Sequence, residues 1–524
     1  MNLDALPDDI LLLIWDRLAE GPLGEVAMFP HTIRAPLLRA CRRFYRLFLP
    51  HLYKHYRFQQ SIIPLRSGYI IPPSIPTFTQ FVLRNRVVRA SIQKLDAGSW
   101  FVGQASYDKP GVIPALVERG LALACIPADD VAHWRRALLL GHDDLWISLL
   151  LILLPNLRSL QLKIPGMIPE ERTYLEDIVE RVLDRRIPTK ALHQLTHLHV
   201  SFDFPCHNIH LSRFIPWTQL PSIRYFRMSA ALDNFEGRKL FVPPPKPSGL
   251  THIDLFASNC INSLTNLLTA CKRLESFKYN HHDQLVWDSQ FHITMRSHAE
   301  VPREQWISPE EHDTMMWLAG ESILDPPRFY DALFKHRSTL RTLWLTLTPN
   351  VSKQDEDRPS SRGSPKLLGS LSEFTALTQL RVRLHNLLEF PHDDVTLPPV
   401  TPLLDLLPSS LESVLIEECP RPSLSVVIEQ LRSLVKHRYS HFPHLKKLII
   451  QQPAHESNQT PHPLPVVMPG SATDVTLGLS ANKWADLDIE PSVYLALLDL
   501  KRDFDQVGVK FVVVDKNEWR FRFI

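Results

Sequence analysis

Glycine is scarce and proline abundant in this sequence, which has 17 glycines and 44 prolines among 524 residues. Average usage is roughly 7% glycine and 5% proline, so the usual balance is reversed. Phosphate-binding P-loops, Rossmann glycine motifs, G-x-S-x-G nucleophile elbows and H-E-x-x-H zinc motifs are all missing. We therefore expect no catalytic residues, no cofactor and no enzymatic activity.

A charge excess of either sign is also missing. The chain has 58 Lys and Arg against 56 Asp and Glu, a formal net charge of +2, so its overall charge does not favour nucleic acid or an anionic membrane as a partner. The six cysteines form no C-x-x-C pair, which favours a reducing compartment.

Long apolar runs are absent as well. The most apolar run, Leu149 to Leu154, falls far short of the ~20 residues that a bilayer span needs. Acidic Asp4, Asp8 and Asp9 stand where a secretory signal needs basic residues followed by an apolar core. The sequence therefore predicts a protein of the cytoplasm, the nucleus or both, without a membrane partner.

The first segment of the chain, up to residue 58, has the pattern of short amphipathic helices. Pro7 suits a first helical turn, and apolar residues follow at helical spacing: Ile10, Leu11, Ile14, Trp15 and Leu18. Pro36 opens a second helix that we expect Pro50 to end, and Leu52, Tyr53 and Tyr56 begin a third apolar stretch. Three short helices make a small core, so we expect part of this apolar surface to pack on a partner protein.

The second helix also carries a basic group, Arg39, Arg42, Arg43 and Arg46, lying mostly off its apolar stripe. Such a group is compatible with nucleic-acid binding, but a solvated helix face is the commoner role of this pattern. We adopt the solvated face.

The segment Leu6-Pro7-Asp8-Asp9-Ile10, followed by Ile14, Leu18, Leu38, Cys41, Arg42, Arg43 and Phe44, resembles an F-box. The connection around Gly21 to Ile33 is longer than that family usually has. The resemblance implies an adaptor that docks on a Skp-type linker, and through it on a cullin, as the substrate receptor of a ubiquitin ligase. The docking residues that it implies are Leu6, Pro7, Ile10, Leu11, Ile14, Leu38, Cys41 and Phe44.

A repeat of the form L-x-x-L-x-L, with substitutions, occurs nine times from Leu157 onward. The motifs begin at Leu157, Leu195, Ile223, Leu250, Leu274, Leu340, Leu377, Leu411 and Leu445. Their spacing is mostly at or above the ~20 to 29 residues of leucine-rich repeats. Each motif predicts a short strand with a return segment, often helical, and stacked units predict a parallel sheet. An ordinary α/β protein in which Leu-rich strands recur by chance is the alternative.

The expected fold class is α/β, with a three-helix F-box followed by an irregular leucine-rich-repeat-like solenoid with a parallel sheet. The expected domains are the helical module 1–58, a proline-containing linker 59–111, the solenoid 112–452, and a proline-rich loop with a C-terminal cap at 453–524. We expect an insertion at 281–327 and a polar loop at 353–366 inside the solenoid.

The phase of the repeat predicts which side chains leave the sheet on its open face, because alternate residues of a strand point to opposite sides. Cations outnumber anions there, with only Asp254 and Glu417 on the acidic side. Such a face suits an acidic or phosphorylated protein segment, although the same residues would also keep an open sheet soluble. The candidate binding residues are Lys163, Tyr225, Arg227, Lys278, Trp344, Arg381, Arg383 and Lys447.

Three groups could be imagined as metal sites: His142-Asp143-Asp144, His281-His282-Asp283 and His392-Asp393-Asp394. Zinc sites usually need spaced ligand pairs, so we expect solvated loop residues and no metal. Two rivals to the adaptor remain open. One is a scaffold or repeat-type binding protein with a divergent F-box that delivers no substrate. The other is an enzyme with a diffuse site in the 281–327 insertion.

Overall fold

The computed structural model describes residues 6–18, 36–58, 63–65, 68–70, 74–100, 111–164, 173–187, 190–202, 209–233, 247–281, 326–347, 367–452 and 491–515. The chain divides into two compact units. The first unit holds Met1–Ile209, Arg213–Ser229 and Lys246–Gly249, and the second holds His210–Ser212, Ala230–Pro245 and Leu250–Ile524.

The first unit begins with helices. These are α1 (Asp8–Arg17), a short helix at 36–40 and α3 (Arg42–Tyr53). The break falls at Cys41, whose extended backbone lets its Sγ accept a hydrogen bond from the Phe44 N–H at 3.4 Å, which is an N-cap arrangement. Pro50 does not end the helix as expected. It lies inside the last turns of α3, so that Leu52 and Tyr53 continue that helix and Tyr56 belongs to a strand.

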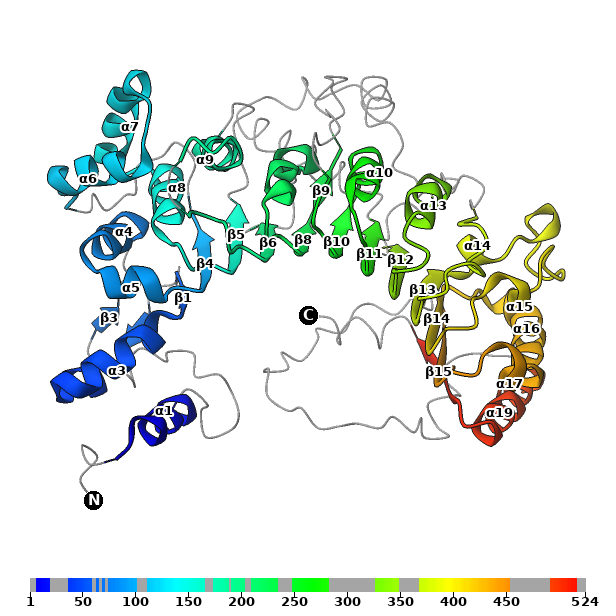
Figure 1. The fold of residues 1–524 in the computed structure, drawn as a ribbon. Coiled ribbons are helices and arrows are strands. Elements are labelled where there is room, and N and C mark those ends of the chain that lie inside the picture. The colour runs from blue at the N-terminus through cyan, green and yellow to red at the C-terminus, as the bar shows by residue number, and fades with distance from the viewer. Residues whose placement is uncertain are drawn as a thin grey trace, which may run out of the picture. The chain divides into compact units, whose positions relative to one another are not determined.

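The sheet of the first unit has five parallel strands in the order β1 (His55–Arg57), β4 (Lys94–Ser99), β5 (Ser159–Ile164), β6 (His197–Phe202) and β8 (Tyr225–Ser229). Helices α8 and α9 lie on one side of β4 and β5 (Figure 1). The helices of this unit that follow α3 are α4 (Ile75–Arg84), α5 (Arg86–Ser91), α6 (Pro114–Ala124), α7 (Ala128–Leu140), α8 (Asp143–Leu153) and α9 (Tyr174–Leu183), with the 3-10 turn η3 (Pro216–Gln219). A separate hairpin joins β2 (Ile63–Leu65) and β3 (Gly68–Ile70).

The segment 59–111, expected as a linker, differs from that expectation because it contains α4, α5 and β4. Ser74 and Asn85 cap the two helices through side-chain oxygens, and Pro76 sits in the first turn of α4, where proline is tolerated. The prolines that suggested an irregular segment therefore include one that starts a helix. Strand β4 makes this segment part of the repeat.

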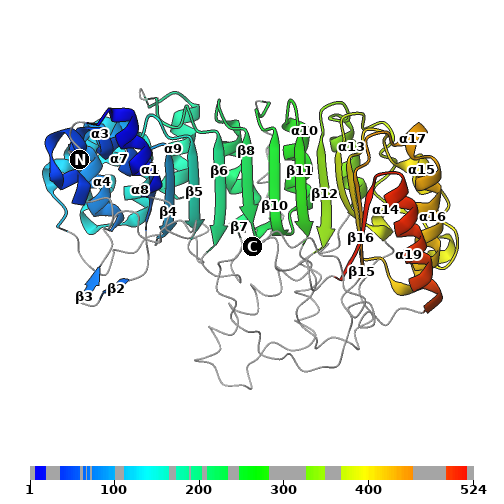
Figure 2. The ribbon, with the colours of Figure 1, turned by 90° about the horizontal axis from the view of Figure 1, so that it is seen from below.

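The second unit has seven parallel strands in chain order. They are β10 (His252–Ser258), β11 (Ser276–His281), β12 (Thr342–Leu347), β13 (Gln379–Arg383), β14 (Ser413–Glu417), β15 (Lys447–Gln452) and β16 (Lys510–Asp515). Figure 2 shows β10, β11 and β12 side by side.

Helices and short elements connect these strands. The helices are α10 (Ile261–Ala270), α13 (Pro326–Phe334), α14 (Leu384–Leu387), α15 (Leu403–Leu406), α16 (Leu424–Lys436), α17 (Arg438–His441) and α19 (Pro491–Gln506). The 3-10 turns η5 (Pro391–Asp393) and η6 (Arg421–Ser423) also lie between these strands. Before β10 in the chain come the 3-10 turn η2 (Leu211–Phe214) and the two-residue strands β7 (Ile209–His210) and β9 (Ala231–Leu232).

Every one of the nine L-x-x-L-x-L motifs runs into a strand, from Leu160 and Leu162 in β5 to Leu448 and Ile450 in β15. Those four side chains are fully buried, as are most of the motif residues between them. Within each unit the strands pair in chain order, which is the arrangement of a stacked repeat and not of a doubly wound sheet with its reversal of order. The predicted α/β fold with a parallel, solenoid-like sheet is confirmed at this level.

Three expected segments lie outside the described residues: the connection around Gly21 to Ile33, nearly all of the 281–327 insertion, and the polar loop 353–366. The expected loop after residue 452 lies outside them too, whereas α19 and β16 occupy the expected cap. Among the helices that the structure describes, none has the length and apolar character needed to cross a membrane.

The cysteines differ in burial and therefore in expected reactivity. Burial raises the pKa of Cys271 to about 12 and also raises the pKa of Cys260 and Cys419, whereas Cys125 is exposed at the end of α6. Because the thiolate is the reactive form, we expect iodoacetamide at pH 8 to label Cys125 in the folded chain and to leave those three unlabelled. Peptide mass spectrometry measures this, and labelling of Cys271 as fast as of Cys125 would contradict it.

Candidate functional site

Five buried side chains hold the N-terminal helices together. Leu11 and Trp15 of α1 pack on Phe44, Phe48 and Leu52 of α3. We call these residues the N-terminal cluster. The Trp15 and Phe48 rings are stacked with 4.6 Å between centroids, and Phe44 meets Phe48 at 5.3 Å. Offset stacking of this kind adds to the burial of apolar area, so the cluster fixes α1 on α3.

Arg43 of α3 ties down the segment before α1. Its Nε donates to Asp8 Oδ1 at 3.1 Å, and its Nη2 donates to the Leu6 carbonyl at 2.7 Å. The Arg43 and Asp8 side chains are 39% and 58% exposed, so the ion pair contributes little to stability. Its consequence is geometric, because it brings the two ends of the predicted F-box motif together.

The structure separates the eight predicted linker-binding residues into two groups. Leu11 and Phe44 are buried in the N-terminal cluster, and Leu6, Leu38 and Cys41 pack against it, partly buried. Pro7, Ile10 and Ile14 are exposed. The exposed residues are therefore the ones that a partner can reach, and the buried ones hold the helices.

One residue of that exposed surface was missed by the sequence reasoning. Leu13 is 62% exposed and lies on the same side of α1 as Ile10 and Ile14, which are 42% and 37% exposed. We call Ile10, Leu13 and Ile14 the α1 face. The run from Ile10 to Ile14 is apolar throughout, so helical spacing alone does not tell which of its residues point to the core. Their i, i+3, i+4 spacing is the signal that suggests a shared side.

In the first unit the open side of the sheet carries Lys163 on β5 and Tyr225 and Arg227 on β8, as predicted from the repeat phase. Tyr225 and Arg227 are exposed. Tyr225 stacks on His197 of β6, with 4.2 Å between ring centroids and 3° between planes. The structure therefore adds a histidine that the sequence reasoning did not select.

In the second unit three candidate residues stand in one row across neighbouring strands. Lys278, Trp344 and Arg381 are register partners on β11, β12 and β13. Lys278 Nζ lies 3.7 Å from the centroid of the Trp344 ring, and Arg381 Cζ lies 5.5 Å from it. These are cation–π contacts, and they hold the tryptophan between two cations.

Two of the candidate binding cations in the second unit are paired with carboxylates. Arg381 lies 2.5 Å from Glu417, and Arg383 lies 2.5 Å from Glu418. The sequence analysis did not include Glu418 among the acidic residues of the open face. The excess of positive charge near β13 and β14 is therefore smaller than the sequence suggested. Lys447 stands in register with Ser413 on β14 and Lys510 on β16.

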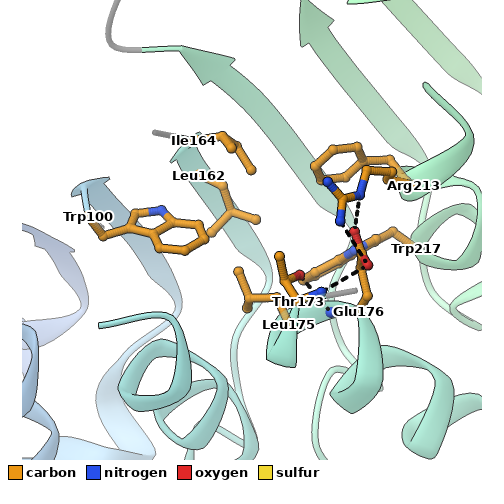
Figure 3. A pocket seen from close by; sticks show the side chains of 9 residues that line it. Trp100, Leu162, Ile164, Thr173, Leu175, Glu176, Arg213 and Trp217 are labelled. Carbon is orange, nitrogen blue, oxygen red and sulfur yellow. Dashed lines mark hydrogen bonds and ion pairs between the residues drawn. The ribbon is translucent and has the colours of Figure 1, made fainter. Parts of the chain in front are cut away.

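A pocket lies in the first unit on the core side of the sheet, the side to which Leu162 and Ile164 point (Figure 3). It has an empty volume of about 300 Å³, its open mouth included. Figure 3 shows Trp100 on one side of it and Trp217 on the other. The complete lining is Trp100, Leu162, Ile164, Thr173, Leu175, Glu176, Arg213, Phe214 and Trp217.

The polar part of the pocket lining is an ion pair built on the start of α9. The Arg213 Nε donates to Glu176 Oε1 at 2.6 Å, and the Thr173 N–H donates to Glu176 Oε2 at 3.2 Å in a capping box. Since Glu176 is held by both partners and the rest of the lining is apolar, we assign this pocket to the packing of α9 on β5.

No described group of three or more His, Cys, Asp or Glu side chains is arranged to hold a metal ion. His142, Asp143 and Asp144 lie at the start of α8, where acidic residues complement the positive end of the helix. His392 lies within the turn η5 and Asp394 directly after it, and the Asp394 carboxylate accepts hydrogen bonds from Thr396. His282 and Asp283 lie outside the described residues.

Comparison with protein-family models gives two matches to a leucine-rich repeat domain, at residues 119–322 and 310–461. Together they extend from residue 119 to residue 461, which is more than half of the chain. The chain belongs to the leucine-rich repeat family. No curated protein matches it.

Leucine-rich repeat domains are generally protein-binding modules, and repeat proteins of this kind use extended sheet surfaces for binding. In this leucine-rich repeat protein the surfaces of that type are the open sides of the strands in each unit, with the exposed tyrosine in the first unit and the Lys–Trp–Arg row in the second. Tyrosine, tryptophan and arginine are the residues that dominate interface energetics.

Proposed function

We propose that this leucine-rich repeat protein is the substrate-recognition adaptor of a ubiquitin ligase. Its N-terminal helices dock on a Skp-type linker, and through the linker on a cullin, while the repeat sheet holds a protein substrate that is acidic or phosphorylated. The chain carries no catalysis of its own in this proposal, uses no cofactor and works in the cytoplasm or the nucleus.

The observation that carries the docking step is the α1 face. Ile10, Leu13 and Ile14 are three large apolar side chains on one side of a helix, each more than a third exposed. The opposite side of the same helix is already occupied, because Leu11 and Trp15 fill the N-terminal cluster. An apolar helix side without a described neighbour is the kind of surface that a partner's groove takes up. The resemblance of the surrounding motif to an F-box names the linker as that partner.

The mechanism that follows is catalysis by proximity. A substrate held on the sheet raises the effective concentration of its lysines at the ligase's activated ubiquitin thioester. The adaptor then needs two surfaces, one for the linker and one for the substrate. The α1 face and the open sheet sides are two separate surfaces of these types.

Binding of the purified linker to the full chain tests the docking step. The variant Ile10→Gln, Leu13→Gln, Ile14→Gln keeps good helix formers and removes the apolar side chains. Each buried large aliphatic side chain contributes about 1.5–3 kcal/mol, so we expect the linker affinity to fall by at least about 100-fold. Biolayer interferometry with an immobilised linker measures the change.

A matched control is available on α7, where Leu139 and Leu140 are 43% and 52% exposed. The variant Leu139→Gln, Leu140→Gln removes a similar apolar surface elsewhere, and we expect it to bind the linker like the wild type. Failure of the folded wild type to bind the linker would reject the adaptor and leave a repeat-type protein-binding module. The scaffold would be indicated if the chain binds the linker but the cellular lifetime of the protein held on its sheet does not change when the cullin is inactivated.

A further inference from the structure

A row of basic and histidine side chains crosses the open side of the first unit's sheet at the start of its strands. His55 on β1 pairs in register with Lys94 on β4, Lys94 with Ser159 on β5, and Ser159 with His197 on β6. We call His55, Lys94, Ser159 and His197 the basic row. Tyr225 on β8 continues it, in register with His197.

The side chains of the basic row are accessible and carry charge of one sign only. His55, Lys94 and His197 are exposed, and Ser159 is half-buried. The row contains no carboxylate. Asp96 stands two residues beyond Lys94 on β4, and its carboxylate is 2.8 Å from Arg57 Nε. Exposed Lys54 and Arg158 directly precede β1 and β5 and add cations at the same end of the sheet.

Both histidines of the row are shifted toward the neutral form in the unbound protein. Partial burial, then Lys94, then Lys54 lower the pKa of His55, and partial burial followed by Lys94 lowers the pKa of His197. The titratable and aromatic groups beside His197 are Lys94 and Tyr225, and its Nδ1 forms a 2.8 Å hydrogen bond with the Thr196 hydroxyl. The charged groups beside His55 are Lys94 and Lys54. An anion placed over the row would offset the repulsion from Lys94 and favour the protonated imidazoles.

Tyr225 also favours the protonated form of His197. The two rings are stacked in parallel at 4.2 Å. A cationic imidazolium is attracted by the face of an aromatic ring more than a neutral imidazole is, so the stack holds His197 in place where its charge is useful.

We propose that the basic row binds a short acidic, unphosphorylated segment of a partner protein, and that it binds this segment more tightly as the pH falls. The proposal rests on the protein-binding function proposed above and names the partner chemistry and the part of the sheet. It places the acidic partner on the first unit, whereas the sequence analysis assigned binding of an acidic segment to strands along the whole repeat.

The geometry sets the length of that segment. Neighbouring strands lie about 4.8 Å apart, so the four steps from His55 to Tyr225 span about 19 Å. An extended chain covers about 3.3 Å per residue, so about six residues cross the row. A fluorescein-labelled peptide with six consecutive glutamates is therefore the probe, with a six-glutamine peptide as its neutral counterpart.

Fluorescence anisotropy with the full chain at pH 7.5 and pH 5.5 tests the proposal. The histidines become protonated as the pH falls through their lowered pKa values, while glutamate side chains stay mostly ionised, so the added attraction is on the protein. We expect the hexaglutamate peptide to bind roughly tenfold tighter at pH 5.5. The hexaglutamine peptide should bind at neither pH.

Two variants separate the fixed charge from the titrating ones. His55→Gln with His197→Gln should bind the peptide like the wild type at pH 7.5 and lose most of the gain at pH 5.5. Lys94→Gln should weaken binding several-fold at both pH values. His444→Gln with Lys272→Gln replaces exposed residues in turns of the second unit and should change nothing.

Several outcomes would overturn the proposal. One is an affinity that is the same at both pH values, and another is a gain at pH 5.5 that survives the double histidine variant. Binding of a phosphoserine peptide of the same length without binding of hexaglutamate would assign the row to phosphate instead. None of these results involves the linker, so failure here is distinct from failure of the adaptor, which the α1 face variant reports.

Discussion

Replacing Trp15 by alanine is expected to abolish capture of the Skp-type linker while the repeat sheet stays folded. Trp15 is 1% exposed and is the largest side chain of the N-terminal cluster, stacked on Phe48. Removing a buried tryptophan side chain costs about 3–5 kcal/mol. Only Leu11 would then remain buried from α1, which is too little to hold a ten-residue helix in place.

The loss of function and the loss of structure can be measured separately. Hydrogen exchange of residues 8–17 reports the detachment of α1, and the main thermal unfolding transition reports the repeat sheet. We expect fast exchange in α1, no linker binding, and a Tm within about 2 °C of the wild type, since one helix can open locally with its own free energy while the rest of the fold stays intact. Trp15→Phe, which keeps a ring against Phe48, should recover part of the binding.

The exposed neighbour Leu13 supplies the contrast. Leu13→Ala removes a side chain that is 62% exposed, so α1 should keep its slow exchange while linker affinity falls. If Trp15→Ala left linker binding intact, α1 would not be the docking element, whatever its exposed side chains suggest.

The repeat could be predicted from the sequence because its signal is local. Leu160 and Leu162 alternate with polar residues within one strand, and the same phase recurs in each unit, so a single pattern predicts strand, inward face and outward face together. Strand β4 was missed although Ile92 and Leu95 have the same spacing, because Ala97 stands where the motif has a large residue. At β1 the corresponding positions are aromatic, with Tyr56 in the strand and Phe58 directly after it.

The surfaces were predictable only in part, because their charges are set by pairing between strands far apart in sequence. Arg381 and Glu417 are 36 positions apart and meet because β13 and β14 are register partners. The two histidines of the basic row are placed in line with Lys94 for the same reason, through three strand pairings. A single strand shows which side chains point outward but not which neighbour neutralises them.

The helix boundary at Cys41 shows another limit. Pro50 was the stronger stop signal in the sequence, since proline lacks the N–H that an interior turn donates. In the structure α3 continues past it, and the boundary falls at Cys41, where an extended residue caps the next helix through its sulfur. A thiol is a weak acceptor that sequence rules for caps do not include.

At the ion pair of the pocket, Arg213→Met should lower the free energy of unfolding of the first unit by about 2–3 kcal/mol. Both partners are 17% exposed, so the Glu176 carboxylate would be left in a mostly dry site with only the Thr173 N–H to satisfy it. An uncompensated charge costs more than the pair contributes. Chemical denaturation followed by the fluorescence of Trp100 and Trp217, which line the same pocket, measures the change.

The second substitution decides between an unpaired charge and lost packing. Adding Glu176→Gln to Arg213→Met removes the charge and keeps an oxygen for the Thr173 N–H, so the double variant should recover more than half of the lost stability. Arg135→Met, at an exposed pair with Glu118, should have no measurable effect, because solvent screens that pair. A double variant less stable than Arg213→Met would show that the Arg213 side chain stabilises the pocket through its packing and not by neutralising Glu176.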